Sequence, residues 1–323
     1  MSVETELEAI RTGAAIYPLT DRAFLRITGA DATRWLNGMV TNSIQSLQPG
    51  EGNYNFLLNA QGRIQGDCMV YREDGDVFRL ASDGNQINTI EQLLNNFIIM
   101  DDVEAAKVYE RIETLLVIGS MASQALRSIG MATPPPNRLA LVDSTEGRIR
   151  VMTTAAPDHF ELLLTPEQVG AVCKRLNLPR ISTEALEAHR ILTATPKYGI
   201  DIRNTETHKD LPQETAQTHA LHFNKGCYLG QEIVERIRSR GQVHRTFTPF
   251  TLTGELPPLP APLEATIAGQ TRPAGELTSA MRIGDTVHAL GYLRREFATH
   301  PLTYPGGTAK PALSSHETLN PAP

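Results

Sequence analysis

The stretch Lys225-Gly226-Cys227-Tyr228-Leu229-Gly230-Gln231-Glu232 decides how the rest of the chain is interpreted. Two glycines bracket a thiol and a tyrosine, and residues 233–241 follow with the apolar and basic spacing of a helix. Both glycines permit a positive φ or a close approach of backbone, and the lysine places a cation beside the thiol, which favours the thiolate. We therefore expect a tight turn that presents reactive side chains at the start of a helix.

The thiol of Cys227 has two interpretations. It is a candidate nucleophile or soft metal ligand, whereas most lone cysteines are small buried hydrophobes without chemistry. The three cysteines are widely spaced and lack a C-x-x-C pair, which indicates a reducing compartment and too few thiolates to hold an iron–sulfur cluster alone. His219, His222 and Cys227 offer too few ligands for a metal site, and we expect none.

Length and charge narrow the class of protein. The chain has 323 residues, enough for about two domains, and a formal net charge of −6. An acidic balance argues against nucleic-acid binding, which needs clustered Lys and Arg. No apolar run reaches the ~20 residues of a membrane span, and the acidic N-terminus has no secretory signal. We expect a cytoplasmic protein that binds neither nucleic acid nor membrane.

Hydrophobic patterning predicts two similar rounds of strands and helices. The first round has strands at 24–29, 53–58, 64–71 and 77–81, with helices at 32–40, capped by Asp31, and 87–100. The second has strands at 114–118, 139–142, 149–152 and 160–164, with helices at 122–129 and 166–176. Such an arrangement is typical of ferredoxin-like α+β layers.

The remaining segments differ from these two rounds in composition and in their predicted elements. Residues 183–193 predict one more helix, and 196–224 are rich in polar and turn residues, as functional loops are. From residue 246 onward, short strands and many prolines predict a small β-barrel, with a weakly ordered tail over 302–323. The expected domains are therefore 1–245, an α+β region of two half-domains, and 246–323.

The octet KGCYLGQE resembles the signature of the YgfZ/IBA57 family of folate-binding proteins, relatives of the glycine-cleavage T-protein. The resemblance runs from about Phe24 to Arg295. It implies a T-protein-like α+β fold, with two ferredoxin-like subdomains and a C-terminal β-barrel around a central folate cavity. It also implies bound tetrahydrofolate, in an unknown one-carbon state, and iron–sulfur client or assembly proteins as partners.

The resemblance also implies a set of site residues. Cys227 matches the characteristic thiol of the family, and Asp67 matches the aspartate that meets the pterin ring, whereas its local pattern alone favours the solvent face of a strand. The other expected cofactor-binding residues are Arg190, Tyr198, Lys225, Tyr228, Gln231, Glu232 and Arg236. The basic stretch that begins at Lys225 is either a site for a folate γ-carboxylate tail or an ordinary solvated helix face.

Three functions stay open at this point. The first is a tetrahydrofolate-binding factor that supports iron–sulfur cluster assembly or repair. The second is a folate-dependent aminomethyltransferase or other one-carbon transferase, against which stands Leu192, where the T-protein has an acidic residue. The third is a folate-binding module without chemistry at Cys227.

Overall fold

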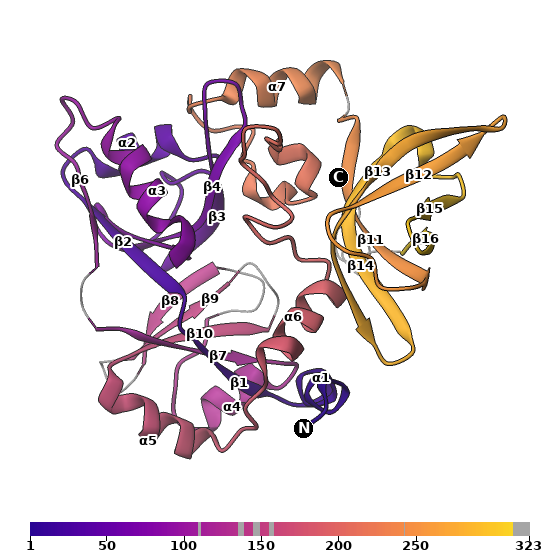
Figure 1. The fold of residues 1–323 in the computed structure, drawn as a ribbon. Coiled ribbons are helices and arrows are strands. Elements are labelled where there is room, and N and C mark those ends of the chain that lie inside the picture. The colour runs from indigo at the N-terminus through magenta and orange to yellow at the C-terminus, as the bar shows by residue number, and fades with distance from the viewer. Residues whose placement is uncertain (109–110, 135–138, 145–148, 155–157, 242, 313–323) are drawn as a thin grey trace. The chain divides into compact units, whose positions relative to one another are not determined.

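The computed structural model describes residues 1–108, 111–134, 139–144, 149–154, 158–241 and 243–312. The chain divides into two compact units. The sheet unit comprises Glu8–Ser182 and His219–Gln231, and the barrel unit comprises Met1–Leu7, Thr183–Thr218 and Glu232–Pro323. Figure 1 shows the helices and strands of both units.

The sheet unit is built on one ten-stranded sheet, whose strands pair in the order β1-β7-β10-β9-β8-β3-β4-β5-β2-β6. The helices and strands up to the centre of the chain are α1 (Val3–Thr12), β1 (Ala15–Leu19), β2 (Arg22–Thr28), α2 (Ala32–Met39), β3 (Glu51–Leu58), β4 (Ile64–Asp74), β5 (Val77–Asp83), α3 (Gly84–Asn95) and β6 (Glu104–Lys107). They are followed by β7 (Glu113–Ile118), α4 (Ala122–Ser128), β8 (Leu139–Asp143), β9 (Arg150–Thr153), β10 (His159–Leu164) and α5 (Pro166–Leu176).

The two halves of the sheet repeat one pattern. From the centre outward the first half runs β3-β4-β5-β2-β6 and the second runs β8-β9-β10-β7-β1, and antiparallel pairing of β3 with β8 joins them. In each half a strand leads through a helix into three antiparallel strands and a second helix. The outermost strand differs, because β6 follows its half whereas β1 precedes its half in the chain.

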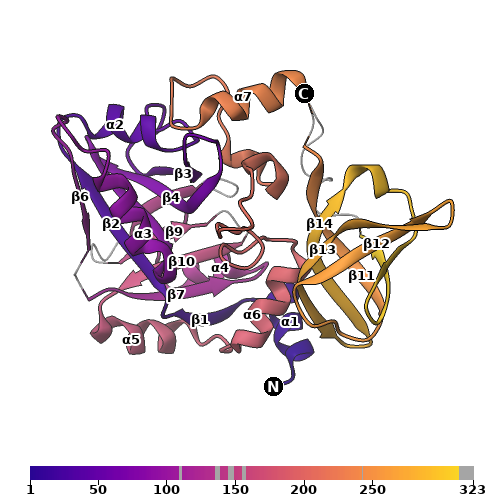
Figure 2. The same cartoon turned by 45° about the horizontal axis from the view of Figure 1, so that its top comes forward.

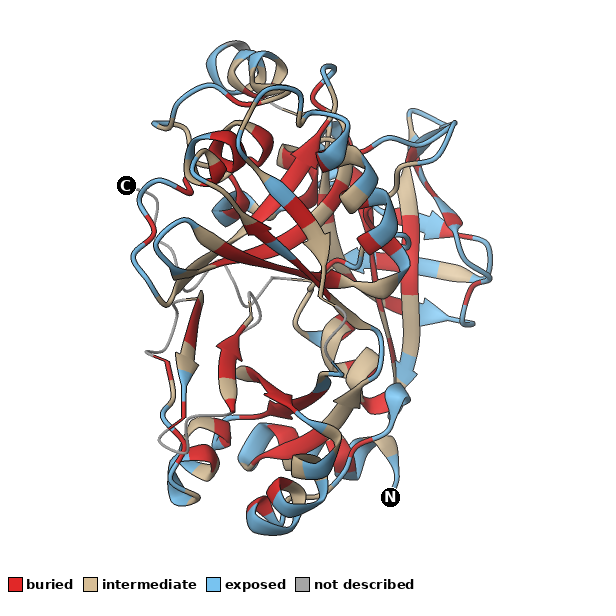
Figure 3. Cartoon of the chain, turned by 90° about the vertical axis from the view of Figure 1, so that its left-hand side faces the viewer, coloured by how far each residue is buried: buried red, intermediate tan, exposed pale blue. Residues whose placement is uncertain are grey.

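Three apolar cores hold the sheet unit together. One lies between α2, α3 and the outer face of the first half-sheet, and another lies between α4, α5 and the outer face of the second. The third lies between the two inner faces and includes Phe24, Met69, Tyr71, Met152 and Leu163. The sheet therefore curls so that its halves face each other, and buried residues line both faces of its central strands (Figure 3).

The barrel unit contains a closed barrel in the order β11-β14-β13-β12-β15-β16, closed by pairing of β11 with β16. Its strands are visible in Figure 2, and its elements are α6 (Thr183–Leu192), α7 (Gln231–Arg240), which begins at the boundary of the unit, β11 (Arg245–Gly254), β12 (Ala261–Ile267), β13 (Gln270–Ile283), β14 (Thr286–Arg294), β15 (Leu302–Tyr304) and β16 (Gly307–Pro311). Helix α6 packs on the outside of β13 and β14 through Ile191, Leu290 and Tyr292.

Most predicted elements are confirmed, with four differences. The carboxylate of Asp31 does not cap α2, because it accepts a hydrogen bond from the backbone of Asp102 at 2.9 Å instead. Helix α3 begins and ends earlier than predicted. Strands β1 and β6 were not predicted. Residues 302–311, predicted as part of a weak tail, form two barrel strands, and 313–323 lie outside the described residues.

Among the described residues, no helix combines the length and the apolar character that crossing a membrane requires.

Candidate functional site

Lys225 fixes the predicted turn to the end of α2. Its ammonium donates to the backbone carbonyl oxygens of Asn37, Val40 and Asn42 at 2.6, 2.7 and 2.6 Å. A cation is favourable at a helix C terminus, where carbonyl groups lack partners within the helix. Burial lowers the pKa of Lys225 to about 7, and below that pH the charged form supplies all three N–H groups to the three acceptors. The lysine thus serves the backbone, a role that the sequence did not indicate.

Gly230 brings the turn against the β3–β4 hairpin. Its φ is +82°, and a Cβ atom at this position would lie 2.5 Å from the carbonyl oxygen of Asn59. The expected positive φ and close approach are therefore confirmed for Gly230. They are wrong for Gly226, whose φ is not in the left-handed region and whose nearest neighbour would lie 3.9 Å from an added Cβ. Of the two glycines in the octet, only Gly230 is required by the backbone conformation and the close contact.

The middle of the octet positions a tyrosine and a glutamine. Tyr228 is buried, its ring lies 5.0 Å from the ammonium of Lys225, and this geometry is a cation–π contact. The side-chain oxygen of Gln231 accepts a hydrogen bond from the backbone of Tyr228 at 3.2 Å. Leu229 donates its backbone N–H to Gly38 at 3.0 Å, which ties the turn to α2 a second time.

Cys227 is exposed at this turn. Its neighbours in the chain are held by the contacts just described, so the thiol faces solvent from a fixed backbone. Cys68, by contrast, is buried on β4, and burial raises the pKa of its thiol well above the usual value. Of these two cysteines, Cys227 is the one placed for chemistry with an external partner.

Asp67 is a half-buried carboxylate on β4. It accepts hydrogen bonds from the hydroxyl of Tyr54 at 2.5 Å and from the side-chain amide of Gln86 at 2.7 Å. Burial raises the pKa of Asp67, the two hydrogen bonds lower it, and the nearby charge of Asp83 raises it further. Each carboxylate oxygen has a second lone pair, so the group retains the capacity to accept hydrogen bonds from a ligand.

A continuous set of contacts connects Asp67 with the octet. Tyr54 donates to Asp67 and its backbone oxygen accepts from the side chain of Asn42 at 3.2 Å. The backbone oxygen of Asn42 accepts from Lys225. The ring of His219 lies 5.4 Å from the ring of Tyr54. Five of the predicted site residues therefore lie in the sheet unit, namely Asp67, Lys225, Cys227, Tyr228 and Gln231.

Arg190 lies in the barrel unit, where partners occupy all five of its N–H donors. It pairs with Glu187 at 2.6 and 2.9 Å and with Asp201 at 2.6 Å, and it donates to Ser279 at 2.8 Å and to the backbone of Thr195 at 2.7 Å. These bonds fasten α6 to β13 and leave no donor over for a ligand in this arrangement. Binding of a cofactor by Arg190 stays a prediction.

The other predicted residues of the barrel unit lie in the loop after α6 and on α7. Tyr198 is half-buried in the loop after α6, and Glu232 and Arg236 are exposed on α7. Arg238 on the same helix pairs with Glu235 at 3.5 Å. That α7 carries a folate tail stays a prediction, as does the meeting of these residues with those of the sheet unit.

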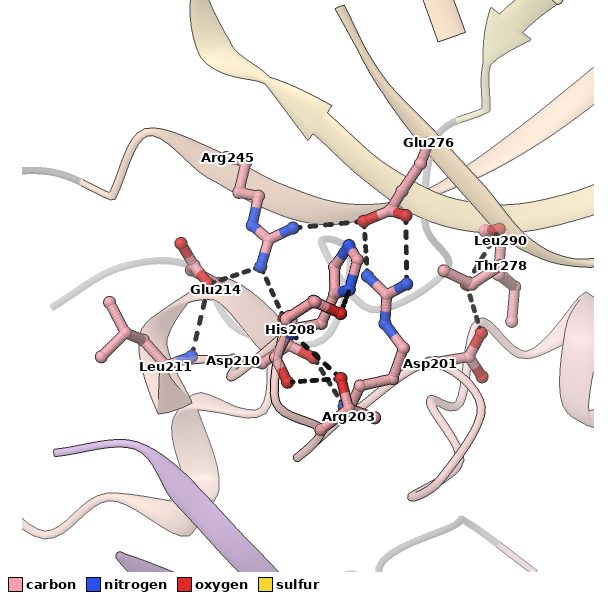
Figure 4. Close-up of polar contacts among 12 residues, drawn as sticks. Asp201, Arg203, His208, Asp210, Leu211, Glu214, Arg245, Glu276, Thr278 and Leu290 are labelled. Atoms are coloured by element: carbon pink, nitrogen blue, oxygen red, sulfur yellow. Dashed lines mark hydrogen bonds and ion pairs between the residues drawn. The ribbon is translucent and has the colours of Figure 1, made fainter. Parts of the chain in front are cut away.

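The loop after α6 carries an ion-pair network that the sequence did not indicate (Figure 4). Arg245 pairs with Asp210 at 2.5 Å, with Glu214 at 3.2 Å and with Glu276 at 3.3 Å. Arg203 also pairs with Glu276. The network holds the polar loop against the barrel, so these charged residues have a structural role within the unit.

Three residues that contact the site, Tyr54, Gln86 and Asn42, were not predicted from the sequence. A signal for Tyr54 existed, because Phe56 lies opposite Asp67 and Tyr54 lies opposite Met69 in the hairpin, which makes Tyr54 a diagonal neighbour of Asp67. Gln86 and Asn42 come from α3 and from the loop after α2, and no pattern of spacing places them. The described residues contain no group of three or more His, Cys, Asp or Glu side chains arranged to hold a metal ion.

The chain is similar to one protein family and to several known proteins. Residues 1–211 match the family described as the GCVT N-terminal domain. The chain is 25% identical over 81% of its length to the mitochondrial iron-sulfur cluster assembly factor IBA57 homolog of Neurospora crassa, and covers 58% of that protein. It is 24% identical over 75% of its length to the aminomethyltransferase of a Nostoc species, and covers 67% of it.

A solved structure has the same fold. The glycine cleavage system aminomethyltransferase T from Bartonella henselae superposes with a TM-score of 0.80 over 97% of this chain and 89% of that chain, at 17% identity. The T-protein-like fold predicted from the sequence is therefore confirmed. The chain spans about three fifths of the length of the curated relative from Neurospora.

Proposed function

Because the chain belongs to the GCVT N-terminal domain family, we propose that it binds tetrahydrofolate and supports the assembly or repair of iron–sulfur proteins. The observation that carries the proposal is the pairing, within the sheet unit, of a half-buried carboxylate with an exposed thiol on a fixed turn. Asp67 and Cys227 are connected through Tyr54, Asn42 and Lys225, as described above.

Asp67 would bind the pterin. The pyrimidine edge of a reduced pterin presents an amino group and ring N–H donors, which one carboxylate can accept together. Tyr54 and Gln86 fix the carboxylate while leaving lone pairs for these donors. Hydrogen bonds to an ionised carboxylate are stronger in a partly dry site. The burial that raises the pKa of Asp67 therefore also strengthens its hydrogen bonds to a ligand with matching donors.

Cys227 would react with or bind a partner protein, and it would not serve to stabilise the fold. Its exposure leaves the sulfur accessible, and Lys225 and Gly230 keep its backbone in place. With three cysteines in the whole chain, we expect client or assembly proteins to supply the other ligands of any cluster.

Calorimetric titration with tetrahydrofolate under anaerobic conditions tests the pterin site. We expect saturable binding to the wild type and a loss of about tenfold or more in affinity for Asp67→Ala, because a charge-assisted hydrogen bond is worth about 1.5–3 kcal/mol. Asp74→Ala is the control, since Asp74 is an exposed carboxylate at the end of the same strand. Equal affinities for the wild type and Asp67→Ala reject this placement of the pterin.

A cellular test addresses the thiol. In cells that lack the protein, we expect Cys227→Ser to fail to restore the activities of iron–sulfur enzymes, whereas Cys173→Ser restores them, because Cys173 is half-buried on α5, outside the turn. If Cys227→Ser restores the activities fully, the chain acts as a folate-binding module without thiol chemistry. The cytoplasmic location stays a prediction and is read from the same cells by fractionation.

Folate-dependent aminomethyl transfer is the second candidate, supported by the similarity to the Nostoc aminomethyltransferase. Leu192 is 42% exposed at the end of α6, at the position where the T-protein resemblance expects an acidic residue. A turnover assay with an aminomethylated carrier protein and tetrahydrofolate distinguishes the two functions. We expect no turnover by the wild type, and turnover would establish the transferase.

A further inference from the structure

The inner face of the sheet unit has polar clusters at two opposite ends. Along β4, the alternate residues Asp67, Met69, Tyr71 and Glu73 point to this face. Asp67 belongs to the proposed folate site, and Met69 and Tyr71 belong to the apolar core between the half-sheets. Glu73 begins a second cluster at the far end, to which neither the family resemblance nor the proposed function assigns a role.

A cleft of about 810 Å³ lies at this far end. Its charged lining residues are Arg26, Glu73, Arg79, Arg111, Asp143 and Arg150. Four guanidinium groups thus face two carboxylates, in a chain whose net charge is −6. The volume lies within the range of about 300–1,000 Å³ that is usual for small-molecule sites.

Glu73 neutralises only part of this charge. It accepts hydrogen bonds from Arg79 and from Arg150, both at 2.6 Å, and Arg26 approaches it only to 4.0 Å. Asp143 is 71% exposed and lies 3.3 Å from Arg150. The cleft therefore keeps an excess of positive charge after its internal pairs are formed.

Arg79 gives the second and independent sign of a ligand. It is 6% exposed, and one of its terminal nitrogens, Nη1, is buried without a hydrogen-bond partner in the part of the chain that the structure describes. Its guanidinium lies 5.5 Å from the ring of Phe24, which orients the group. Buried donors are nearly always paired, so an unpaired guanidinium N–H beside a cleft indicates an absent acceptor.

We propose that this cleft binds a small molecule with two oxyanion groups, each a carboxylate or a phosphate. The planar fork of a guanidinium matches both groups, and the separation of the four arginines over three strands and one loop suits two anionic groups better than one. The fully buried Tyr71 and the core around it separate the cleft from Asp67. The site is therefore distinct from the proposed folate site.

Calorimetry on the full chain tests the proposal, with pyrophosphate and citrate as the two probes in an anion-poor buffer. We expect saturable binding of at least one probe, weakened about fivefold or more by Arg26→Ala and by Arg111→Ala. Both side chains are exposed, so these variants are expected to fold. Arg79→Lys keeps the charge and removes the fork, and we expect it to weaken binding as well. Tighter binding of pyrophosphate identifies a phosphate ligand, and tighter binding of citrate a carboxylate.

Two controls make the outcome decisive. Arg127→Ala removes an exposed arginine from α4 in the same unit and should leave the affinity unchanged. Asp67→Ala should also leave it unchanged, so failure of the folate site and failure of this site are distinguishable. No saturable binding of either probe, or equal weakening by Arg127→Ala, overturns the proposal.

Discussion

Replacing Lys225 by methionine removes three hydrogen bonds with one nearly isosteric change. The wild-type ammonium bonds the carbonyls of Asn37, Val40 and Asn42. A hydrogen bond from a charged donor contributes about 2 kcal/mol, so the three together contribute about 6 kcal/mol at most. Burial opposes them, because lowering the pKa of the lysine from 10.5 to about 7 corresponds to a cost of up to about 5 kcal/mol. The balance is a net loss of about 1 kcal/mol while the lysine is charged.

Thermal melting and hydrogen exchange measure this loss. For a unit of this size, about 1 kcal/mol lowers the melting temperature by roughly 2–4 °C. The amides of His222 and Leu229, which bond Thr41 and Gly38, should exchange faster in the variant. Lys174→Met, in an exposed lysine of α5, is the matched control and should change neither quantity. A change in melting temperature below about 1 °C, with unaltered exchange at these amides, refutes the reasoning.

The difference in stability between the wild type and Lys225→Met should also depend on pH. The unfolded chain keeps the lysine protonated up to its ordinary pKa of 10.5, whereas the folded chain releases the proton from about pH 7. Between these values the unfolded state binds more protons, so raising the pH favours folding of the wild type. The stability difference between the wild type and Lys225→Met should therefore widen as the pH rises through this window.

Three further predictions concern the rest of the site. Because burial raises the pKa of Asp67 and a pterin needs the ionised carboxylate, the affinity for tetrahydrofolate in calorimetry should fall as the pH is lowered through the raised pKa of this carboxyl group, and Asp67→Asn should abolish this dependence. Thiol titration with an aromatic disulfide should show one fast cysteine that disappears in Cys227→Ser, since Cys68 is 2% exposed; a fast phase that persists would contradict the exposed thiol. In urea unfolding, Gly230→Ala should cost about 2 kcal/mol more than Gly75→Ala, because both glycines have positive φ but only Gly230 would press a Cβ against backbone; equal costs would contradict this contact.

Local patterns were sufficient for most of the fold. The turns at Gly62 and Gly75 have positive φ and connect β3, β4 and β5, which is why this meander could be predicted from its turn residues and from the apolar segments that they separate. Strand β1 could not be predicted, because its partner β7 is about a hundred residues away in the chain and only that pairing defines it. Strands β15 and β16 are short segments among prolines and glycines, and the closure of the barrel stabilises them.

The site was predictable to the extent that it lies in one stretch. The octet identified Cys227 and the left-handed Gly230, both of which depend on local backbone. The use of Lys225 was not predictable, because its acceptors are backbone carbonyls more than 180 residues earlier, and a backbone oxygen has no signature in a sequence. Because Lys225 and Cys227 are close in the sequence, the lysine was expected to favour the thiolate. In the structure its ammonium instead bonds the backbone carbonyls.

The repeated pattern of the two half-sheets explains why the proposed folate site is found in one half only. Both halves have the same order of strands, but the β3–β4 turn of the first half is the one that receives Gly230, through the carbonyl of Asn59. Asp67 lies on the strand that leaves this turn, so the contact that seats the octet also places Cys227 in the half that carries the carboxylate. On the inner face of the second half, Met152 of β9 belongs to the apolar core. One hairpin therefore couples the placement of the thiol to that of the carboxylate, and a loss of thiol presentation in Gly230→Ala should be accompanied by a loss of tetrahydrofolate affinity.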